Sequence, residues 1–82
     1  MVTVAFHPSF RKKLSKIRER ALKERIIKQI AKIGDNPETG KPMRFTRKGT
    51  REVRVTPFRL SYLYIPEEMK IVLLELYHKD EQ

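Results

Sequence analysis

The stretch Arg51-Glu52-Val53-Arg54-Val55-Thr56, continued after Pro57 by Phe58-Arg59-Leu60-Ser61-Tyr62-Leu63-Tyr64-Ile65, decides the fold. Its apolar residues recur at every second position, which is typical of β-strands that bury one face. The apolar face of these two predicted strands carries Val53, Val55, Phe58, Leu60, Tyr62 and Tyr64. The opposite face carries Glu52, Arg54, Arg59 and Ser61. We therefore expect a sheet with a core side and a polar side.

The residues before this stretch predict one strand and two helices. Residues 2–6 alternate and are stopped by Pro8, as in a short strand. Ser9 is the expected N-cap of a first helix, whose apolar face holds Phe10, Leu14 and Ile17. A second helix, with an apolar stripe of Leu22, Ile26, Ile30 and Ile33, is expected to end at Gly34 as its C-cap residue. Residues 18–20 are the expected break between the helices, and one continuous helix is the alternative.

Further segments complete the predicted sheet. Residues 43–45 predict a short strand, and residues 47–50 a turn in which Gly49 supplies a positive φ. Residues 66–69 form a hairpin-like connection to residues 71–77, a nearly all-apolar run that predicts a central strand buried on both faces. The element order is then β-α-α-β-β-β-β. The predicted fold is a single α+β domain over residues 1–82, with two helices on one face of a small, mostly antiparallel sheet and the other face open.

Composition narrows the function before any motif is considered. The 82 residues include 19 Lys and Arg against 10 Asp and Glu, a net charge of +9. Residues 1–33 hold ten basic and two acidic residues, net +8, whereas residues 57–82 hold three basic and five acidic residues, net −2. A basic helical layer attracts polyanions, so we expect a phosphate-rich or acidic partner. With no cysteine, two histidines and no apolar run longer than four residues, we expect a cytoplasmic protein without metal, cofactor or membrane contact.

Three basic side chains are expected to converge on the open face of the sheet. Arg54 and Arg59 lie opposite their apolar neighbours on adjacent strands, and His78 follows where the last strand runs out of apolar residues. Taken singly, each of these residues is also typical of a strand face that is exposed to solvent and has no function. Together they form a candidate site, because histidine, with an ordinary pKa of about 6.5, is suited to proton transfer at neutral pH.

Four segments of the chain form a pattern through their order and spacing. They are the opening strand with Pro8 and Ser9-Phe10-Arg11-Lys12-Lys13-Leu14; Asn36-Pro37 followed by Gly40-Lys41-Pro42-Met43; Arg51-Glu52-Val53-Arg54-Val55 leading to Phe58-Arg59-Leu60-Ser61-Tyr62; and residues 71–76 ending in Tyr77-His78-Lys79. In this order and spacing they resemble the RelE/ParE superfamily of toxins from bacterial and archaeal toxin–antitoxin pairs. The resemblance covers nearly the whole chain and is to the RelE-like branch, whose fold is the one predicted above.

The resemblance implies a toxin that inhibits translation as a ribosome-dependent endoribonuclease. In the implied reaction the ribose 2′-OH attacks the adjacent phosphorus, and no metal ion is required. Arg59 matches the central arginine of the family and is expected to stabilise the transition state. His78 matches the histidine found at the end of the last strand in several members and is expected to act as general acid or base. Arg54 matches a strand position that contacts phosphate, and Lys79 matches a basic residue beside the histidine.

Glu52 departs from the family pattern, since the best-known ribonuclease members carry lysine there. It is expected either to act as the general base or to pair with Arg54. Tyr77 is a candidate for stacking on an RNA base. RNA binding is expected from basic residues of the first helix and of residues 44–51, namely Lys12, Lys13, Lys16, Arg44, Arg47, Lys48 and Arg51.

The resemblance also implies partners, which are the ribosome with its mRNA and a cognate antitoxin. The antitoxin is expected to wrap an acidic, partly helical segment across the basic surface. Two other functions stay open at this point. One is a ParE-like toxin that blocks DNA gyrase by binding and has no enzymatic activity. The other is a basic RNA-binding module without toxicity.

Overall fold

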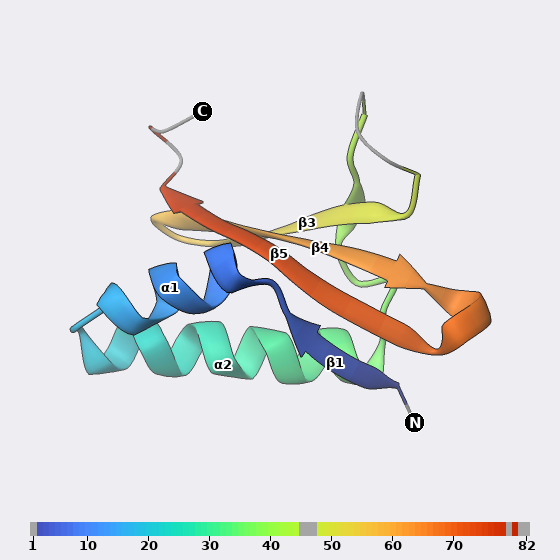
Figure 1. The fold of residues 1–82 in the computed structure, drawn as a ribbon. Coiled ribbons are helices and arrows are strands. Elements are labelled where there is room, and N and C mark those ends of the chain that lie inside the picture. The colour runs from blue at the N-terminus through green and yellow to red at the C-terminus, as the bar shows by residue number, and fades with distance from the viewer. Residues whose placement is uncertain (1, 45–47, 79, 81–82) are drawn as a thin grey trace.

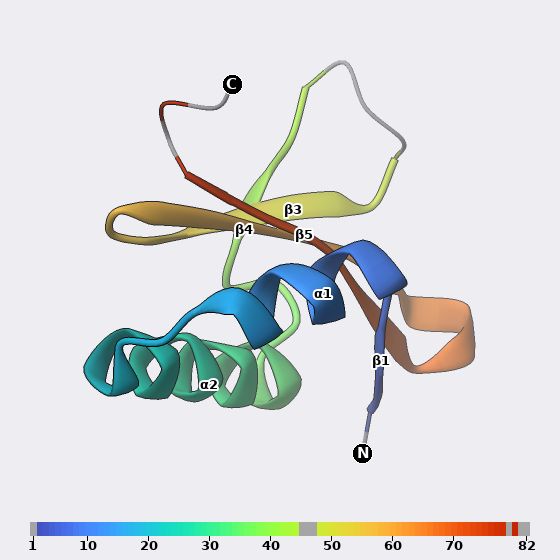
Figure 2. The same cartoon turned by 60° about the vertical axis from the view of Figure 1, so that its left-hand side comes forward.

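The structure, a computed structural model, describes residues 2–44, 48–78 and 80. Its elements are β1 (Thr3–Phe6), α1 (Pro8–Lys16), α2 (Arg20–Asp35), β2 (Lys41–Pro42), β3 (Thr50–Val55), β4 (Phe58–Ile65), the 3₁₀ helix η1 (Pro66–Glu68) and β5 (Lys70–His78). The strands form one sheet in the order β1-β5-β4-β3-β2, in which only β1 and β5 are parallel. Both helices cover the same face of this sheet (Figures 1 and 2). The predicted fold class is therefore confirmed.

The core lies between the helices and the apolar face of the sheet. In the β3–β4 pair Val53 lies opposite Leu60 and Val55 opposite Phe58, so the alternation predicted for these strands is confirmed. The fully buried side chains come from both layers and include Phe10, Ile26, Ile33, Leu60, Tyr62, Ile71 and Leu73. Burying a side chain of this size stabilises a fold by roughly 1.5–3 kcal/mol. This apolar layer fixes which strand residues remain available on the opposite face.

The strand β5 is central in the sheet but is not buried on both faces. It pairs with β1 on one side and β4 on the other. Ile71, Leu73 and Leu76 are buried, whereas Glu75 is exposed, so the prediction of burial on both faces is wrong. The spacing of the buried residues changes from two to three because a β-bulge shifts the register: Ser61 lies opposite Glu75, and Tyr62 lies opposite Leu73.

The helices begin and end close to the expected places, with different caps. A break after Lys16 separates α1 from α2, which begins at Arg20, so two helices are confirmed. The N-cap of α1 is His7 instead of Ser9, because the His7 ring nitrogen Nδ1 accepts a hydrogen bond of 3.1 Å from the Ser9 backbone N–H. The helix α2 continues through Gly34 to Asp35, and the prediction of Gly34 as its C-cap is also wrong, because the C-cap is Asn36.

The turns predicted on either side of β3 and β4 are close to those in the structure, whereas the short strand predicted before β3 is displaced. The short edge strand is Lys41–Pro42, and Arg44 lies in a turn, so the strand expected over residues 43–45 is misplaced; residue 45 lies outside the described residues. Gly49 has a φ of 94°, as the turn predicted. The 3₁₀ helix η1 and Met69 join β4 to β5. Within the described residues no helix is both long and apolar enough to cross a bilayer.

Candidate functional site

The open face of the sheet brings together side chains from three adjacent strands. At one level of the sheet Arg54 on β3 lies opposite Arg59 on β4, and Arg59 lies opposite Tyr77 on β5. Glu52 is two residues before Arg54 and therefore shares its face. We call Glu52, Arg54, Arg59 and Tyr77 the open-face cluster. Its members alternate with buried Val53, Leu60 and Leu76, which explains why they point away from the helices.

Glu52 is the centre of the open-face cluster. Its oxygen Oε1 accepts a hydrogen bond from Nη1 of Arg59 at 3.3 Å, and its oxygen Oε2 accepts one from the Tyr77 hydroxyl. The carboxylate thus reaches from β3 across β4 to β5. Ser61 lies directly opposite Glu52 on β4 and is buried. Because serine is small, it leaves room for Glu52 to cross the middle strand.

Arg59 and Glu52 form an ion pair that water can still reach. Their side chains are 28% and 21% exposed, so the pair is partly shielded and remains accessible to a ligand. Arg54 is exposed beside it. Two arginines directly opposite one another repel, and Glu52 offsets this repulsion by pairing with Arg59. The expectation left two roles for Glu52, general base or partner of Arg54; the ion pair that the structure shows is with Arg59.

His78 lies on the other face of the sheet from Arg59 and Tyr77. It is opposite Phe58, with the two rings edge to face and their centroids 5.5 Å apart. Its nitrogen Nδ1 accepts a hydrogen bond of 3.3 Å from the Asp80 backbone N–H and lies 3.5 Å from the Asp80 carboxylate. The expected convergence of His78 with Arg54 and Arg59 on one face is therefore wrong. The cause is the β-bulge, which moves Tyr77 to the open face and His78 away from it.

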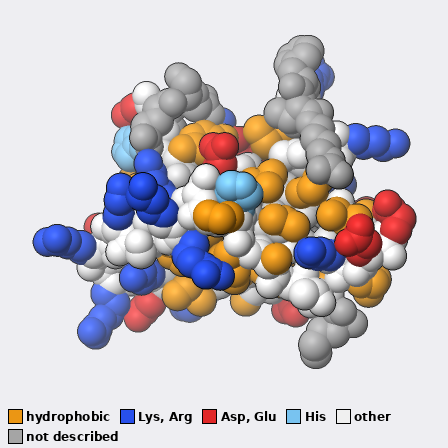
Figure 3. Space-filling view, viewed as in Figure 1, with side chains coloured by type: hydrophobic (Ala, Val, Ile, Leu, Met, Phe, Trp, Pro, Cys, Tyr) orange, Lys and Arg blue, Asp and Glu red, His pale blue; other side chains and the backbone are white. Residues whose placement is uncertain are grey.

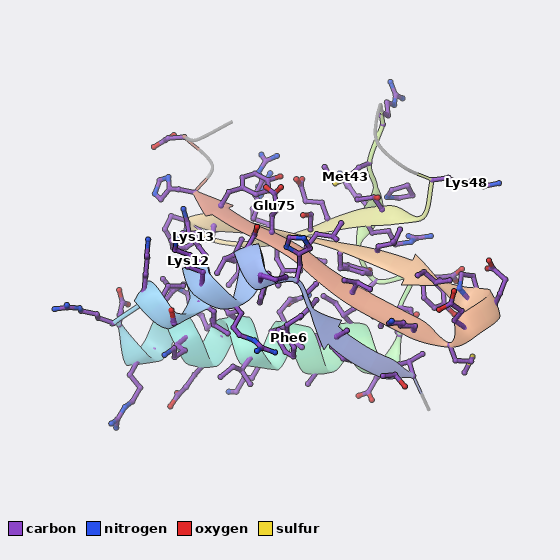
Figure 4. The ribbon with its side chains drawn as sticks, viewed as in Figure 1. Phe6, Lys12, Lys13, Met43, Lys48 and Glu75 are labelled. Atoms are coloured by element: carbon purple, nitrogen blue, oxygen red, sulfur yellow. The ribbon has the colours of Figure 1, made fainter. Side chains whose placement is uncertain are left out.

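Basic residues of α1 border the open-face cluster. The helix packs along β5, and a hollow of about 350 Å³ is lined by Ser9 and Lys13 from α1 and by Glu75, Leu76 and Tyr77 from β5. Lys12 and Lys16 are exposed on the same helix. Figure 4 shows Lys12 and Lys13 on α1 on the same side of the molecule as Glu75, and Figure 3 shows Lys and Arg side chains gathered over this side. A polyanion at the cluster would therefore meet further positive charge at its edge.

The other predicted RNA-binding residues lie apart from the cluster. Arg44 and Lys48 are exposed near the start of β3, at the end of the sheet remote from Arg54 (Figure 4 shows Lys48). A pocket of about 600 Å³ lies there, lined by Lys48, Arg51 and Tyr64 among others. Arg47 and Lys79 lie outside the described residues. Among the described residues, no three acidic or histidine side chains are grouped closely enough to hold a metal ion.

A family model described as the ParE toxin of the type II toxin–antitoxin system parDE matches residues 4–82. The chain belongs to this toxin family. The family model is that of the ParE toxin, and the fold is shared with RelE toxins. The RelE/ParE superfamily that the sequence resemblance predicted is therefore confirmed. No curated protein sequence matches the chain.

Several solved structures share the fold of this toxin. A chain of the intact E. coli RelBE toxin–antitoxin complex superposes with a TM-score of 0.82 at 17% identity, covering 95% of the toxin and 96% of that chain. A chain of the RelBE2 toxin–antitoxin complex from Mycobacterium tuberculosis gives 0.78 at 29% identity, with 95% and 98% covered. The YoeB/ParE toxin from Agrobacterium tumefaciens gives 0.81 at 13% identity, with 94% and 98% covered.

The segment Asn36-Pro37 to Gly40-Lys41-Pro42 of the toxin is anchored to the sheet by hydrogen bonds to the side chains of Tyr62 and Arg51. The Tyr62 hydroxyl donates to the Pro37 carbonyl at 2.6 Å and accepts from the Gly40 N–H at 2.9 Å, and burial raises the pKa of Tyr62. Nη1 of Arg51 donates to the carbonyls of Glu38 and Gly40 at 3.2 and 2.6 Å. A Cβ on Gly40 would lie 2.9 Å from the Glu52 carbonyl oxygen, so glycine is required there. Arg51, a predicted RNA-binding residue, is thus engaged in holding this loop.

Proposed function

We propose that the toxin is an endoribonuclease that cleaves mRNA on the ribosome and so inhibits translation. The observation that carries this proposal is the Glu52–Arg59 ion pair on the open face, with Arg54 exposed beside it. A carboxylate and two guanidinium groups supply a proton acceptor and fixed positive charge, which are the requirements for cleavage by the neighbouring 2′-OH. The RelE-like fold of the chain agrees with this activity class.

Each member of the open-face cluster has a role in the proposed reaction. Glu52 accepts the proton of the ribose 2′-OH; its oxygens have lone pairs beyond those that Arg59 and Tyr77 occupy. The 2′-oxygen then attacks the adjacent phosphorus. Arg59 stabilises the negative charge that develops on the phosphorane, because a planar guanidinium can bind two of its oxygens at once. Arg54 binds a neighbouring phosphate, and the cluster needs no metal ion for these steps.

The basic residues of α1 serve binding and not chemistry in this proposal. Lys12 and Lys16 are exposed and lie on the helix that borders the cluster. Contacts between lysine and phosphate contribute affinity that weakens with salt and carries no sequence information. They would hold the toxin on ribosomal RNA, while base and phosphate contacts at the cluster position the message. His78, on the other face of β5, is not part of the proposed cluster, and a role for Lys79 stays a prediction.

A cognate antitoxin is the proposed protein partner. The structures similar to this chain include toxin–antitoxin complexes from E. coli and Mycobacterium tuberculosis. Residues 1–33 of the chain carry a net charge of +8, from ten basic and two acidic residues, which suits an acidic segment of the antitoxin. Binding to the folded toxin alone would also stabilise this small domain by mass action.

Primer extension on translating ribosomes tests the proposed activity. Purified toxin should produce new 5′ ends in ribosome-bound mRNA, and Arg59→Ala should lower the rate by about 10²–10³-fold, the usual effect of losing one group that stabilises an oxyanion. Arg25→Ala is the matched control, because it removes the same side chain from an exposed position on α2. Absence of new ends with wild type, or equal cleavage by Arg59→Ala, would refute the proposal.

A second candidate function is inhibition of DNA gyrase by binding. It is favoured by the family model, which is the ParE toxin model, and by the position of His78 away from the cluster. A supercoiling assay separates the two candidates. We expect gyrase to remain active in the presence of the purified toxin; inhibition of supercoiling, together with no cleavage of ribosome-bound mRNA, would establish the ParE-like function instead.

A further inference from the structure

Tyr77 stands out within the open-face cluster because nothing in the proposed reaction yet uses it. Its hydroxyl donates a hydrogen bond to Oε2 of Glu52, while Arg59 donates to Oε1 of the same carboxylate. The tyrosine is half-buried and lies opposite Arg59 on the neighbouring strand. The group proposed to accept a proton and a second group able to give one are therefore joined directly.

The proposed cleavage also lacks a group that protonates the leaving 5′-oxygen. Arginine cannot supply this proton, because a guanidinium group holds its proton far above physiological pH and stays protonated in proteins. His78 lies on the other face of the sheet, beside Phe58. A tyrosine hydroxyl, with an ordinary pKa of about 10, is a much stronger acid than the ribose alcohol that leaves.

We infer that Tyr77 is the general acid of the proposed cleavage and that Tyr77 and Glu52 form a two-residue proton relay. This inference rests on the proposed function. Glu52 takes the proton of the 2′-OH as the bond from O2′ to phosphorus forms. As the bond from phosphorus to O5′ breaks, Tyr77 gives its proton to O5′. The tyrosinate then recovers a proton from the Glu52 carboxylic acid through the hydrogen bond that joins them.

The relay accounts for the position of each group. The proton lost by the 2′-OH ends on the 5′-oxygen, so the products are a 2′,3′-cyclic phosphate and a 5′-OH, and both side chains return to their starting states. Arg59 donates a hydrogen bond to the other oxygen of Glu52, so its guanidinium group lies beside the same carboxylate. Ser61, which lies opposite Glu52 on the middle strand, is small enough to let the Glu52 carboxylate reach the Tyr77 hydroxyl directly.

A substrate with a better leaving group tests the assignment of Tyr77. The mRNA is made with a single 5′-bridging sulfur at the cleavage position, because a thiolate leaves without protonation. Tyr77→Phe should cleave ordinary mRNA on the ribosome about 10²–10⁴-fold more slowly than wild type, the usual contribution of a general acid. On the sulfur-containing mRNA it should cleave at nearly the wild-type rate. Tyr64→Phe, which removes a hydroxyl from the helix-facing side of β4, is the matched control and should behave as wild type.

Glu52→Gln provides a second variant with a different signature. Because it removes the proposed base and not the acid, Glu52→Gln should be slow on both substrates, whereas Tyr77→Phe should be slow on ordinary mRNA alone. A general loss of folding in Tyr77→Phe would slow cleavage of both substrates and so would not give this difference. Equal rates for Tyr77→Phe and wild type on ordinary mRNA would overturn the relay. An equal loss on both substrates would also overturn it and leave Tyr77 as a group that only positions Glu52. If wild type cleaves neither substrate, the proposed function itself fails, and the relay fails with it.

Discussion

Arg51 and Arg59 lie on neighbouring strands of the same sheet, but they face different surroundings. Arg51 is opposite Tyr62, on the face that carries the core, and its guanidinium donates to the carbonyls of Glu38 and Gly40. Arg59 is on the open face and donates to the carboxylate of Glu52. Backbone carbonyls can only accept hydrogen bonds, whereas a carboxylate can also take up a proton. The comparison teaches that the partner of an arginine, more than the charge itself, separates a structural position from a candidate catalytic one.

Loss of Arg51 should produce the largest effect on stability. Arg51→Ala removes two charge-assisted hydrogen bonds to the loop that joins α2 to β2, and we expect a loss of about 1.5–3 kcal/mol in the free energy of unfolding. For a domain of this size each 1 kcal/mol lowers Tm by roughly 4–8 °C. Thermal unfolding measures the change, with Arg54→Ala as the control on the same strand. An unchanged Tm would break the comparison, since Arg51 would then have no structural role.

Tyr62→Phe should have a somewhat smaller effect on the same loop. It keeps the ring in the core but leaves the Gly40 N–H and the Pro37 carbonyl without their present partner, which should cost about 1–2 kcal/mol. Urea unfolding gives this value, and Tyr64→Phe on the same strand is the control. If the two variants are equally stable, the hydroxyl of Tyr62 does not anchor the loop.

Alkaline pH offers an independent view of Tyr62. Burial raises its pKa in the folded state above the ordinary value near 10. The stabilisation that belongs to the neutral hydroxyl is therefore complete below pH ~10 and is lost as pH rises from there through the folded-state pKa. Wild type should lose stability over this range more steeply than Tyr62→Phe. Parallel pH curves for the two proteins would contradict a raised pKa.

The smallest effects are expected from single lysines of α1. Lys12→Ala should weaken binding to ribosomes only slightly and lower the slope of log affinity against log salt by about 1, because one phosphate contact is lost. Lys16→Ala should act in the same way, and stability should be unchanged since both side chains are exposed. Binding measured at several salt concentrations tests this. A complete loss of cleavage from either substitution would place that lysine in the chemistry.

The period of residues 51–65 is sufficient to predict the two faces of the sheet, because β3 and β4 keep their alternation through Tyr64. The same reasoning fails on β5. From Ile71 and Leu73 a strict period of two places Tyr77 on the core side and His78 on the open side. The β-bulge reverses this order, and its mark in the residue pattern is Glu75, a charged residue that a strict period of two would place in the core. The role of Arg51 was also hidden, because its hydrogen bonds go to backbone atoms eleven and thirteen residues away.

The caps show a similar limit on a smaller scale. Ser9 and Gly34 are residue types that commonly cap helices. The N-cap of α1 is nevertheless His7 and the C-cap of α2 is Asn36, because the backbone leaves the helical conformation at these two residues. Such shifts of one or two residues leave the packing of the helices unchanged. A shift of one residue in a strand has a larger consequence, since it exchanges the two faces of the sheet and with them the candidate catalytic residues.

The most direct test of the account compares three proteins in one experiment on translating ribosomes. Cleavage of mRNA is measured for wild type, Arg59→Ala and Arg51→Ala at a temperature where thermal unfolding shows all three to be folded. We predict that wild type and Arg51→Ala cleave at similar rates and that Arg59→Ala is slower by about 10²–10³-fold. Equal rates for Arg59→Ala and wild type, or no cleavage by wild type, would contradict the central claim that the open face of the sheet carries the chemistry.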